Sequence, residues 1–293
     1  MLKGSIVALI TPFNEDNSVN FAKLEKLIEY HIANKTDGIV ILGTTAEAST
    51  LNDEERIEVV KFALEKINKR VSVVVGASSN DTAKAVKMAK QYSGMGADYI
   101  LSITPYYNKT NQSGLIKHFE AVAEASTCPI ILYNVPSRTG MSISIEAIKV
   151  LSQNKNIYGI KEASGNISYA SLVSKYLSDD FIMLSGNDDV IVPYMAIGAK
   201  GVISVLANIC PNNTHKLCQL CLEQNYKAAN KLQNELIDVA NSLFLETNPI
   251  PVKAAMNYLG FGVGKVRLPL DEMSTEMYEK MTKIIDANKE LID

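Results

Sequence analysis

Short apolar runs alternate along the chain with amphipathic segments. Eight runs are rich in Val and Ile and close on small or turn-forming residues, which predicts β-strands over residues 5–13, 37–45, 71–78, 97–105, 129–136, 157–164, 181–188 and 201–208. The segments between them place apolar residues at three- and four-residue intervals, which predicts helices over residues 21–33, 53–69, 81–95, 114–125 and 168–176.

This strict alternation predicts a parallel sheet, because parallel strands need long crossover connections and bury both faces. Eight units favour closure into a (β/α)8 TIM barrel. The structural alternative is an open, doubly wound sheet. No G-x-G-x-x-G follows the first strand, where a nucleotide-binding open sheet usually carries it, so we predict the barrel.

Strand signals end after residue 208. Helices are predicted over residues 214–223, 226–246, 250–258 and 274–291. We divide the chain into a catalytic barrel, residues 1–224, and a C-terminal helical extension, residues 225–293, that packs on the barrel or on a neighbouring subunit. Residues 260–265 faintly resemble a phosphate loop, but they follow a helix and lack Walker spacing, which indicates a flexible helix exit.

Composition narrows the class of partner. The 293 residues are 47% hydrophobic and 21% charged, which fits a compact fold and excludes disorder. The net charge of −3 is mild and its signs are interspersed, so we expect a small-molecule partner and neither nucleic acid nor membrane. The N-terminus lacks the pattern of an export signal and the apolar runs are too short to span a membrane, so we expect a cytoplasmic protein.

Four cysteines are too few and too uneven for a disulfide framework, and we expect them reduced. His215, Cys218 and Cys221 share one face of a predicted helix and could ligate a metal. No second set of ligands completes such a site. We therefore favour half-buried helix positions and expect no metal.

Lys161 is the one lysine that the pattern places inside the mouth of the barrel. Most other lysines fall in helices, loops or before strands, where solvated positions are usual. At the end of an apolar strand, desolvation favours a neutral amine, which is a nucleophile for ketones. The alternative is a structural lysine paired with an acid, although the period of two directs Lys161 and Glu162 to opposite faces.

Other polar residues follow neighbouring strands, the end of a barrel that carries active sites. Thr44 and Thr45 follow Gly43 and could hold a carboxylate or simply cap a turn. Tyr133 could serve chemistry or packing, and Arg138 could bind a carboxylate or lie in solvent. The pair Tyr106 and Tyr107 could form a subunit contact or the rim of the site.

Together these segments resemble the dihydrodipicolinate synthase family of the pyruvate-dependent class I aldolase and N-acetylneuraminate lyase superfamily, over essentially the whole chain. Five motifs stand in the family's order: residues 43–47 (GTTAE), 133–140 (YNVPSRTG), 159–165 (GIKEASG), 248–253 (NPIPVK) and 267–270 (RLPL). Five ordered motifs are far more specific than any single residue.

The resemblance implies that Lys161 forms a Schiff base with pyruvate, whose enamine attacks L-aspartate 4-semialdehyde, the step that leads to diaminopimelate and lysine. It implies proton transfer by Tyr133, linked through Thr44 to Tyr107 of a neighbouring subunit. It also implies substrate-binding roles for a second set of residues: Thr45, Arg138, Gly186 and Ile203. Since the imine is its own electron sink, no cofactor is expected.

The resemblance further implies a homotetramer, a dimer of dimers with Tyr106 and Tyr107 at the tight interface. Lysine-sensitive relatives commonly carry His and Glu where this chain has Arg56 and Lys84. Two cations would repel the amines of lysine, so we predict weak or absent feedback inhibition despite the retained Asn80 and Tyr106.

Two other functions fit the same residues. Another pyruvate-dependent aldolase, cleaving N-acetylneuraminate or a 2-keto-3-deoxy sugar, would share the lysine and tyrosine. Arg138 favours a short acidic aldehyde over a sugar. A catalytically silent barrel that binds a keto acid is the alternative from a different class, and the retention of every proposed catalytic group disfavours it.

Overall fold

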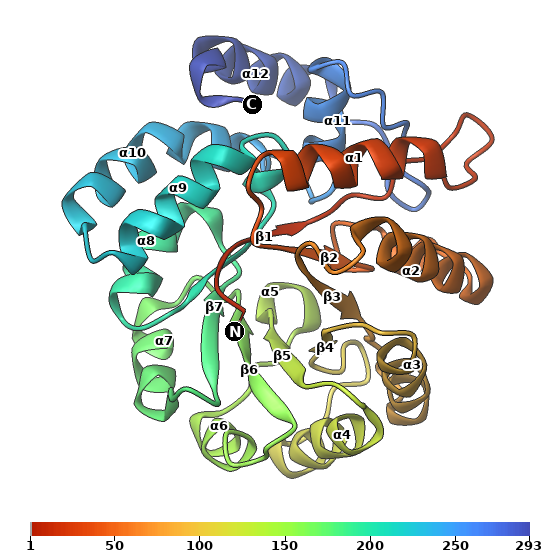
Figure 1. Ribbon diagram of the computed structural model, residues 1–293, viewed down its shortest axis with the longest axis vertical. Helices are drawn as coiled ribbons and strands as arrows, with labels where there is room; N and C mark the ends of the chain where they lie inside the picture. The colour runs from red at the N-terminus through yellow and green to blue at the C-terminus, as the bar shows by residue number, and fades with distance from the viewer. Residues whose placement is uncertain (1) are drawn as a thin grey trace.

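A computed structural model describes residues 2–293, and in them eight parallel strands close into a barrel in sequence order, with β1 paired to β8 (Figure 1). The (β/α)8 prediction is confirmed, and the open-sheet alternative is wrong. The strands are β1 (Gly4–Ala8), β2 (Gly38–Ile41), β3 (Ser72–Gly76), β4 (Tyr99–Ile103), β5 (Ile130–Asn134), β6 (Ile157–Glu162), β7 (Ile182–Ser185) and β8 (Gly201–Ser204).

Each strand is shorter than its apolar run. The run predicted over residues 37–45 gives a strand that ends at Ile41, because Leu42 adopts a left-handed backbone conformation. The carbonyl of Leu42 then approaches β3 so closely that a Cβ at Gly76 would lie 2.1 Å from its oxygen. The residues beyond the strand ends are loops, and these loops carry most of the candidate site.

Helices surround the barrel (Figure 1). Their bounds are α1 (Phe21–Ala33), α2 (Asp53–Ile67), α3 (Thr82–Gly94), α4 (Gln112–Ala125), α5 (Pro136–Thr139), α6 (Ile145–Leu151), α7 (Ile167–Val173), α8 (Ile191–Ala196), α9 (Pro211–Leu222), α10 (Tyr226–Ser242), α11 (Ile250–Tyr258) and α12 (Thr275–Ala287). The nine predicted helices are confirmed to within a few residues. The short helices α5, α6 and α8 were not predicted, because segments of four to seven residues are too short to display a helical period.

The core has two layers that follow the strand period of two. On β2, Val40 points into the barrel while Ile39 and Ile41 face the helices; on β3, Val74 points inward between two outward valines. Burial of each such side chain stabilises the fold by about 1.5–3 kcal/mol. The inner layer ends in polar residues at the carboxyl ends of the strands, so the barrel is a filled core with an open mouth.

The C-terminal helices lie beside the first and the last helices of the barrel (Figure 1). Helix α10 packs on α8 and α9, and α12 packs on α10 and α11. The ring of Tyr30 in α1 lies 5.0 Å from that of Phe261, and its hydroxyl donates to the carbonyl of Asp293.

Residues 260–265 leave α11 as a non-helical segment, as predicted, but the segment is anchored by specific contacts. The amide of Phe13 donates to the Val263 carbonyl across 2.9 Å, and Gly264 has a positive φ and packs directly on the Phe13 backbone. No helix within residues 2–293 is long and apolar enough to cross a membrane.

Candidate functional site

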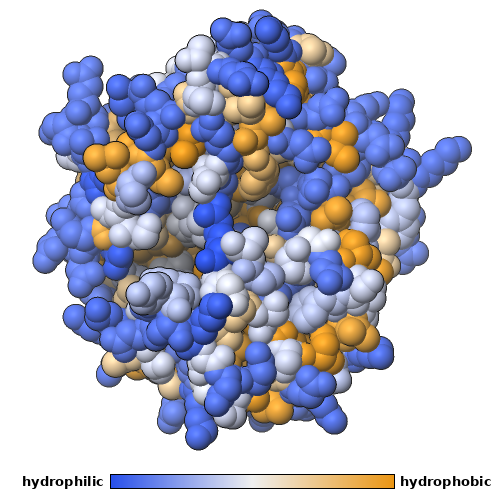
Figure 2. All heavy atoms as spheres, turned by 180° about the vertical axis from the view of Figure 1, so that it is seen from behind, coloured by the Kyte–Doolittle hydropathy of each residue, from blue (hydrophilic) through white to orange (hydrophobic). Residues whose placement is uncertain are grey.

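One cavity of about 180 Å³ opens at the carboxyl ends of the strands. Six residues singled out from the sequence line it: Thr44, Thr45, Tyr133, Arg138, Lys161 and Gly186. The space-filling view of one end of the barrel shows a hollow near its middle, with apolar residues inside and polar residues around it (Figure 2). A small molecule of a few heavy atoms fits such a volume.

Lys161 lies in β6 beside Tyr133 in β5, and the two residues are register partners. The Lys161 side chain is 7% exposed, and its Nζ lies 4.3 Å from the centroid of the Tyr133 ring. Gly186 makes the space for this amine: a Cβ there would lie 3.0 Å from Cε of Lys161 and 2.4 Å from Cβ of Ala163. The strand pairing therefore brings the amine and the phenol together in the cavity.

The ion pairs of the described residues do not include Lys161. Glu162 points away from the cavity: its carboxylate accepts from the Asn134 side chain at 2.6 Å and from the Ser164 amide at 2.7 Å. Burial raises the pKa of Glu162. Structural pairing of Lys161 with Glu162 is therefore wrong, and a buried ammonium without a partner calls for another explanation.

Asp188 is a buried acid that lies within the electrostatic influence of Lys161, and no pattern along the chain singled it out. Its Oδ2 accepts from the amides of Val205 and Leu206, at 2.9 and 3.0 Å. Burial raises the pKa of Asp188, partly offset by hydrogen bonds and by the charge of Lys161. The carboxyl is thus held by the β8 exit loop and contributes to the field at the amine without pairing with it.

Thr44 and Thr45 lie in the turn after β2. Backbone hydrogen bonds close this turn, from the Ala46 amide to Gly43 and from the Glu47 amide to Thr44. The Thr45 hydroxyl is buried and accepts from Nδ2 of Asn248 across 3.0 Å, so it does not cap the turn. Both threonines face the cavity, where their hydroxyls can bind a polar ligand.

Arg138 extends from the short helix α5 at the rim of the same cavity. It is exposed, and its Nη2 donates to the carbonyl of Asn248 across 2.9 Å. The ion pairs of residues 2–293 leave it without a carboxylate. The guanidinium is therefore anchored at one nitrogen while its other donors can receive an anionic ligand.

Three residues singled out from the sequence lie elsewhere. Tyr107 is 92% exposed, lies outside the cavity and adopts a left-handed backbone conformation. Tyr106 lines a neighbouring cavity, together with Thr44, Tyr133 and Arg56. Ile203 is buried in the inner layer of the barrel, and the residue of the β8 exit that reaches the cavity is Val205.

The residues considered for regulation are separated. Arg56 lies in the cavity next to Tyr106, where its Nε and Nη2 donate to the Ala48 carbonyl and its Nη1 pairs with Asp53. Lys84 is exposed on α3. The Arg56 guanidinium therefore adds positive charge to that cavity, whereas the Lys84 side chain lies on the protein surface.

The three possible metal ligands on α9 do not face one another. Nδ1 of His215 lies 2.9 Å from the Asp37 carboxylate, while Cys218 and Cys221 are buried in the hydrophobic core. Burial raises the pKa of both thiols, so the thiolate that a metal needs is disfavoured. Within residues 2–293 no group of three or more His, Cys, Asp or Glu side chains is arranged to hold a metal ion.

Residues of the C-terminal extension close the cavity, and sequence reasoning missed their contribution. Asn248 and Phe244 line the cavity, together with Asn187 and Ser137 from the loops after β7 and β5. Asn248 belonged to a recognised motif, but no pattern along the chain indicated that its side chain meets Thr45, 203 positions away. Only the approach of the extension to the barrel mouth brings them together.

A second lysine is buried, against the expectation that Lys161 alone is exceptional. Lys253 in α11 is 2% exposed, and its Nζ donates to Glu47 at 2.8 Å and to the Lys265 carbonyl at 2.7 Å. The Phe13 ring lies beneath the same ammonium, with its centroid 4.1 Å away. A helical lysine is usually solvated, so no pattern along the chain indicated this burial.

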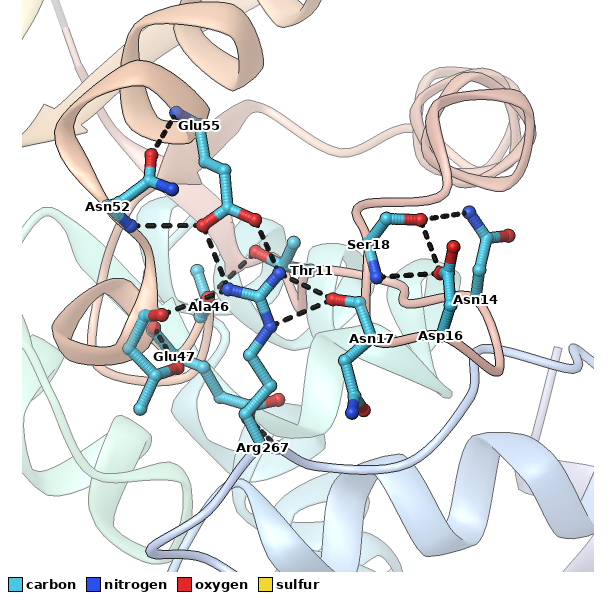
Figure 3. A network of polar contacts seen from close by, with 11 residues as sticks. Thr11, Asn14, Asp16, Asn17, Ser18, Ala46, Glu47, Asn52, Glu55 and Arg267 are labelled. Carbon is cyan, nitrogen blue, oxygen red and sulfur yellow. Dashed lines mark hydrogen bonds and ion pairs between the residues drawn. The ribbon is translucent and has the colours of Figure 1, made fainter.

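Arg267 completes the connection between the extension and the loop after β2 (Figure 3). Its backbone amide donates to Oε2 of Glu47 at 2.8 Å, and its guanidinium forms a bidentate pair with Glu55 in the first turn of α2. Glu55 also forms a capping box with Asn52. The turn that carries Thr44 and Thr45 is therefore fixed from the extension side by charge-assisted hydrogen bonds.

Comparisons with known proteins show the family to which the chain belongs. Residues 1–288 match the model of the dihydrodipicolinate synthetase family. The chain is 49% identical over 286 residues to 4-hydroxy-tetrahydrodipicolinate synthase of Brachyspira hyodysenteriae, covering 98% of this chain and 97% of that protein. It resembles the dihydrodipicolinate synthase structure from Aquifex aeolicus with a TM-score of 0.96, 42% identity and 99% of both chains covered.

A further similar structure is a chloride-inhibited dihydrodipicolinate synthase from Acinetobacter baumannii in complex with pyruvate, with a TM-score of 0.96, 39% identity and 99% of both chains covered. The family model spans nearly the whole chain, and the identity to named relatives extends over nearly all of it. The chain therefore belongs to the dihydrodipicolinate synthetase family.

Proposed function

We propose that this chain condenses pyruvate with L-aspartate 4-semialdehyde, as 4-hydroxy-tetrahydrodipicolinate synthase does in diaminopimelate and lysine biosynthesis. The observation that carries the proposal is Lys161, a buried amine without an ion-pair partner, beside the Tyr133 phenol in a cavity that also holds Thr44, Thr45 and Arg138. The relatives bear that enzyme name at about half identity over their full length.

In the first step the amine of Lys161, after loss of its proton, attacks the ketone carbon of pyruvate. Tyr133 lies beside the amine and supplies the proton with which the former carbonyl oxygen leaves as water. The product is an imine, a carbon–nitrogen double bond that acts as an electron sink, so no metal or organic cofactor is needed. Thr45 and neighbouring backbone amides hold the pyruvate carboxylate.

The imine makes the pyruvate methyl group acidic, and loss of one of its protons gives an enamine. The enamine carbon attacks the aldehyde carbon, and the new alkoxide takes up a proton. The amine of the second substrate then attacks the imine carbon, closes the ring and releases Lys161. Arg138 orients this substrate by binding its carboxylate with the donors that Asn248 leaves free.

Tyr107 acts from a second copy of the chain. Its exposed side chain does not line the cavity of its own subunit, whereas a crossing tyrosine would place its hydroxyl near Thr44 of the partner. We propose a homotetramer, a dimer of dimers, with Tyr106 and Tyr107 at the tight interface. Thr44 would then pass protons between Tyr133 and the partner's Tyr107.

Arg56 and Lys84 lead us to propose weak or absent inhibition by lysine, because their positive charges oppose an incoming diamine. We place the enzyme in the cytoplasm. We also retain residues 1–224 as the catalytic barrel and 225–293 as its extension, although Asn248 and Phe244 give the extension a share of the cavity wall.

Gly186 fits the proposed set of substrate-binding residues, while Ile203 would act only from beneath the cavity.

One experiment separates this function from its alternatives. The protein is incubated with pyruvate, reduced with borohydride and digested, and the adduct is located by mass spectrometry. Condensation with L-aspartate 4-semialdehyde is assayed in parallel. We expect an adduct on Lys161 together with condensation. An adduct without condensation would identify a sugar-cleaving aldolase, and absence of both would identify a keto-acid-binding barrel.

A further inference from the structure

Asn248 lies where the extension meets the mouth of the barrel, just before α11. Its side chain is 5% exposed and that of Thr45 is 3% exposed. Nδ2 of Asn248 donates to Oγ1 of Thr45 across 3.0 Å. The bond joins a residue proposed to bind the substrate carboxylate to one that has no assigned role.

The direction of this hydrogen bond decides what the Thr45 hydroxyl can do. An amide NH2 group can only donate, whereas a hydroxyl has one proton and two acceptor lone pairs. Oγ1 of Thr45 is therefore the acceptor from Asn248, and its proton is left for a group in the cavity. A carboxylate offers only acceptors, so the hydroxyl is oriented to bind an acid rather than a donor group.

The fold gains little from this amide itself. Oδ1 of Asn248 is buried and has no hydrogen-bond partner among the described residues. An unpaired buried oxygen costs more stability than one neutral hydrogen bond usually returns. A side chain retained for packing alone would avoid this cost, so the amide points to a role in the site.

The neighbouring contacts hold Asn248 and Thr45 in register. Five residues after Asn248, Lys253 binds the carboxylate of Glu47, which follows Thr45 by two residues. The Asn248 carbonyl also accepts from Nη2 of Arg138. These contacts hold the backbone around Asn248 and around Thr45, so the Asn248 amide and the Thr45 hydroxyl stay next to each other.

We propose, on the basis of the proposed function, that Asn248 is a positioning residue that fixes the polarity of the Thr45 hydroxyl for the carboxylate of the keto acid. Reversing that polarity affects pyruvate binding more than turnover. In Asn248→Asp, the new carboxylate accepts the hydrogen bond from the Thr45 hydroxyl and adds a negative charge near the substrate. In Asn248→Ala, the hydroxyl is left free to rotate.

The test measures KM and kcat for pyruvate in Asn248→Asp and Asn248→Ala, each also in a Thr45→Val background. We expect Asn248→Asp to raise KM by about tenfold or more, which corresponds to about 1.4 kcal/mol, with a smaller change in kcat. In the Thr45→Val background, Asn248→Ala is expected to change KM by less than about twofold, because interacting residues are not additive.

Asn257→Ala is the matched control. This amide also lies in the extension, where it bonds Gly264 and Val263, and it does not line the cavity. We expect it to lower the melting temperature without raising KM. An unchanged KM in Asn248→Asp, or equal effects of Asn248→Ala in both backgrounds, would overturn the inference. A wild-type protein that borohydride does not trap with pyruvate would instead refute the proposed function on which the inference rests.

Discussion

The ammonium of Lys253 lies 2.8 Å from the carboxylate of Glu47, and both side chains are almost completely buried. The pair joins the C-terminal extension to the turn after β2, which carries two residues of the candidate site. Burial lowers the pKa of Lys253 to about 8, against the opposing effect of Glu47. A buried pair of this kind fixes geometry, since its Coulomb attraction is offset by lost hydration.

Lys253→Met is expected to destabilise the fold by about 3–5 kcal/mol, because it leaves the Glu47 carboxylate buried without a counter-charge. The double variant Lys253→Met/Glu47→Gln is expected to recover part of this loss, since the uncompensated charge is gone. Urea unfolding of the wild type, of the single variants Lys253→Met and Glu47→Gln and of the double variant gives the coupling energy. Additive effects of the two substitutions would contradict a dependence of one group on the other.

Acid sensitivity is expected from His31, which is fully buried in α1 with neither ring nitrogen hydrogen-bonded among the described residues. Burial lowers the pKa of His31 to about 3 from its usual 6.5. Between these values the unfolded chain binds the proton and the folded chain does not, so stability falls as the pH drops through this range.

The slope from this one group approaches about 1.4 kcal/mol per pH unit. His31→Leu removes the titrating group, and its free energy of unfolding is expected to depend less on pH between 6 and 4 than that of the wild type. Urea titrations at several pH values measure both slopes. Parallel slopes for the two proteins would show that His31 does not contribute.

Gly186→Ala is expected to abolish trapping of pyruvate, because its Cβ would collide with Ala163 and crowd Cε of Lys161. A displacement of about 1 Å at the reacting amine can cost about 100-fold in rate. Gly94→Ala is the matched control, since a Cβ at that position meets no atom within 4 Å. Equal trapping by both variants would show that the cavity accommodates the methyl group.

Arg138→Met is expected to raise the KM for L-aspartate 4-semialdehyde by about 10- to 100-fold, the value of one or two charge-assisted hydrogen bonds. Trapping of pyruvate should stay near the wild-type level, because Arg138 contacts the rim and not the amine. Steady-state titration of each substrate separates the two effects. A selective rise in the pyruvate KM would instead assign Arg138 to the first substrate.

Mixing two inactive variants tests whether Tyr107 acts in the partner subunit. Lys161→Ala lacks the amine and Tyr107→Phe lacks the hydroxyl, so each homo-oligomer is expected to be impaired. After exchange of subunits, half of the dimers are mixed and each regains one complete site, so about a quarter of the sites should be active. No recovery after demonstrated exchange would place the role of Tyr107 within its own subunit or remove it.

Several features of the fold followed from local pattern. Short apolar runs rich in Val and Ile, each ending in turn-forming residues, predicted every strand. The apolar stripe of residues 21–33 predicted a helix with the correct bounds. Strand ends were less predictable. An apolar residue such as Leu42 looks the same along the sequence in a strand and in the loop after it, so the departure of Leu42 from β2 was not visible.

The candidate site was predicted as a set of strand-end residues, because a parallel barrel brings all carboxyl ends to one face. That rule gathered Lys161, Tyr133, Thr45 and Arg138 without any knowledge of distance. Ile203, which came from the family resemblance and not from this rule, lies in the inner layer of the barrel, two residues before Val205, which lines the cavity. The rule missed Asn248, since the rule concerns strands and Asn248 follows α10.

The sequence by itself determined the repeating units, the closed barrel and the lysine at the end of the sixth strand, because these depend on periodicity and on interactions between neighbouring units. Only the tertiary structure decided which polar groups meet across the chain: Asn248 with Thr45, and Lys253 with Glu47. Those contacts join residues about two hundred positions apart, and their formation depends on how the extension packs on the barrel, which no local pattern encodes.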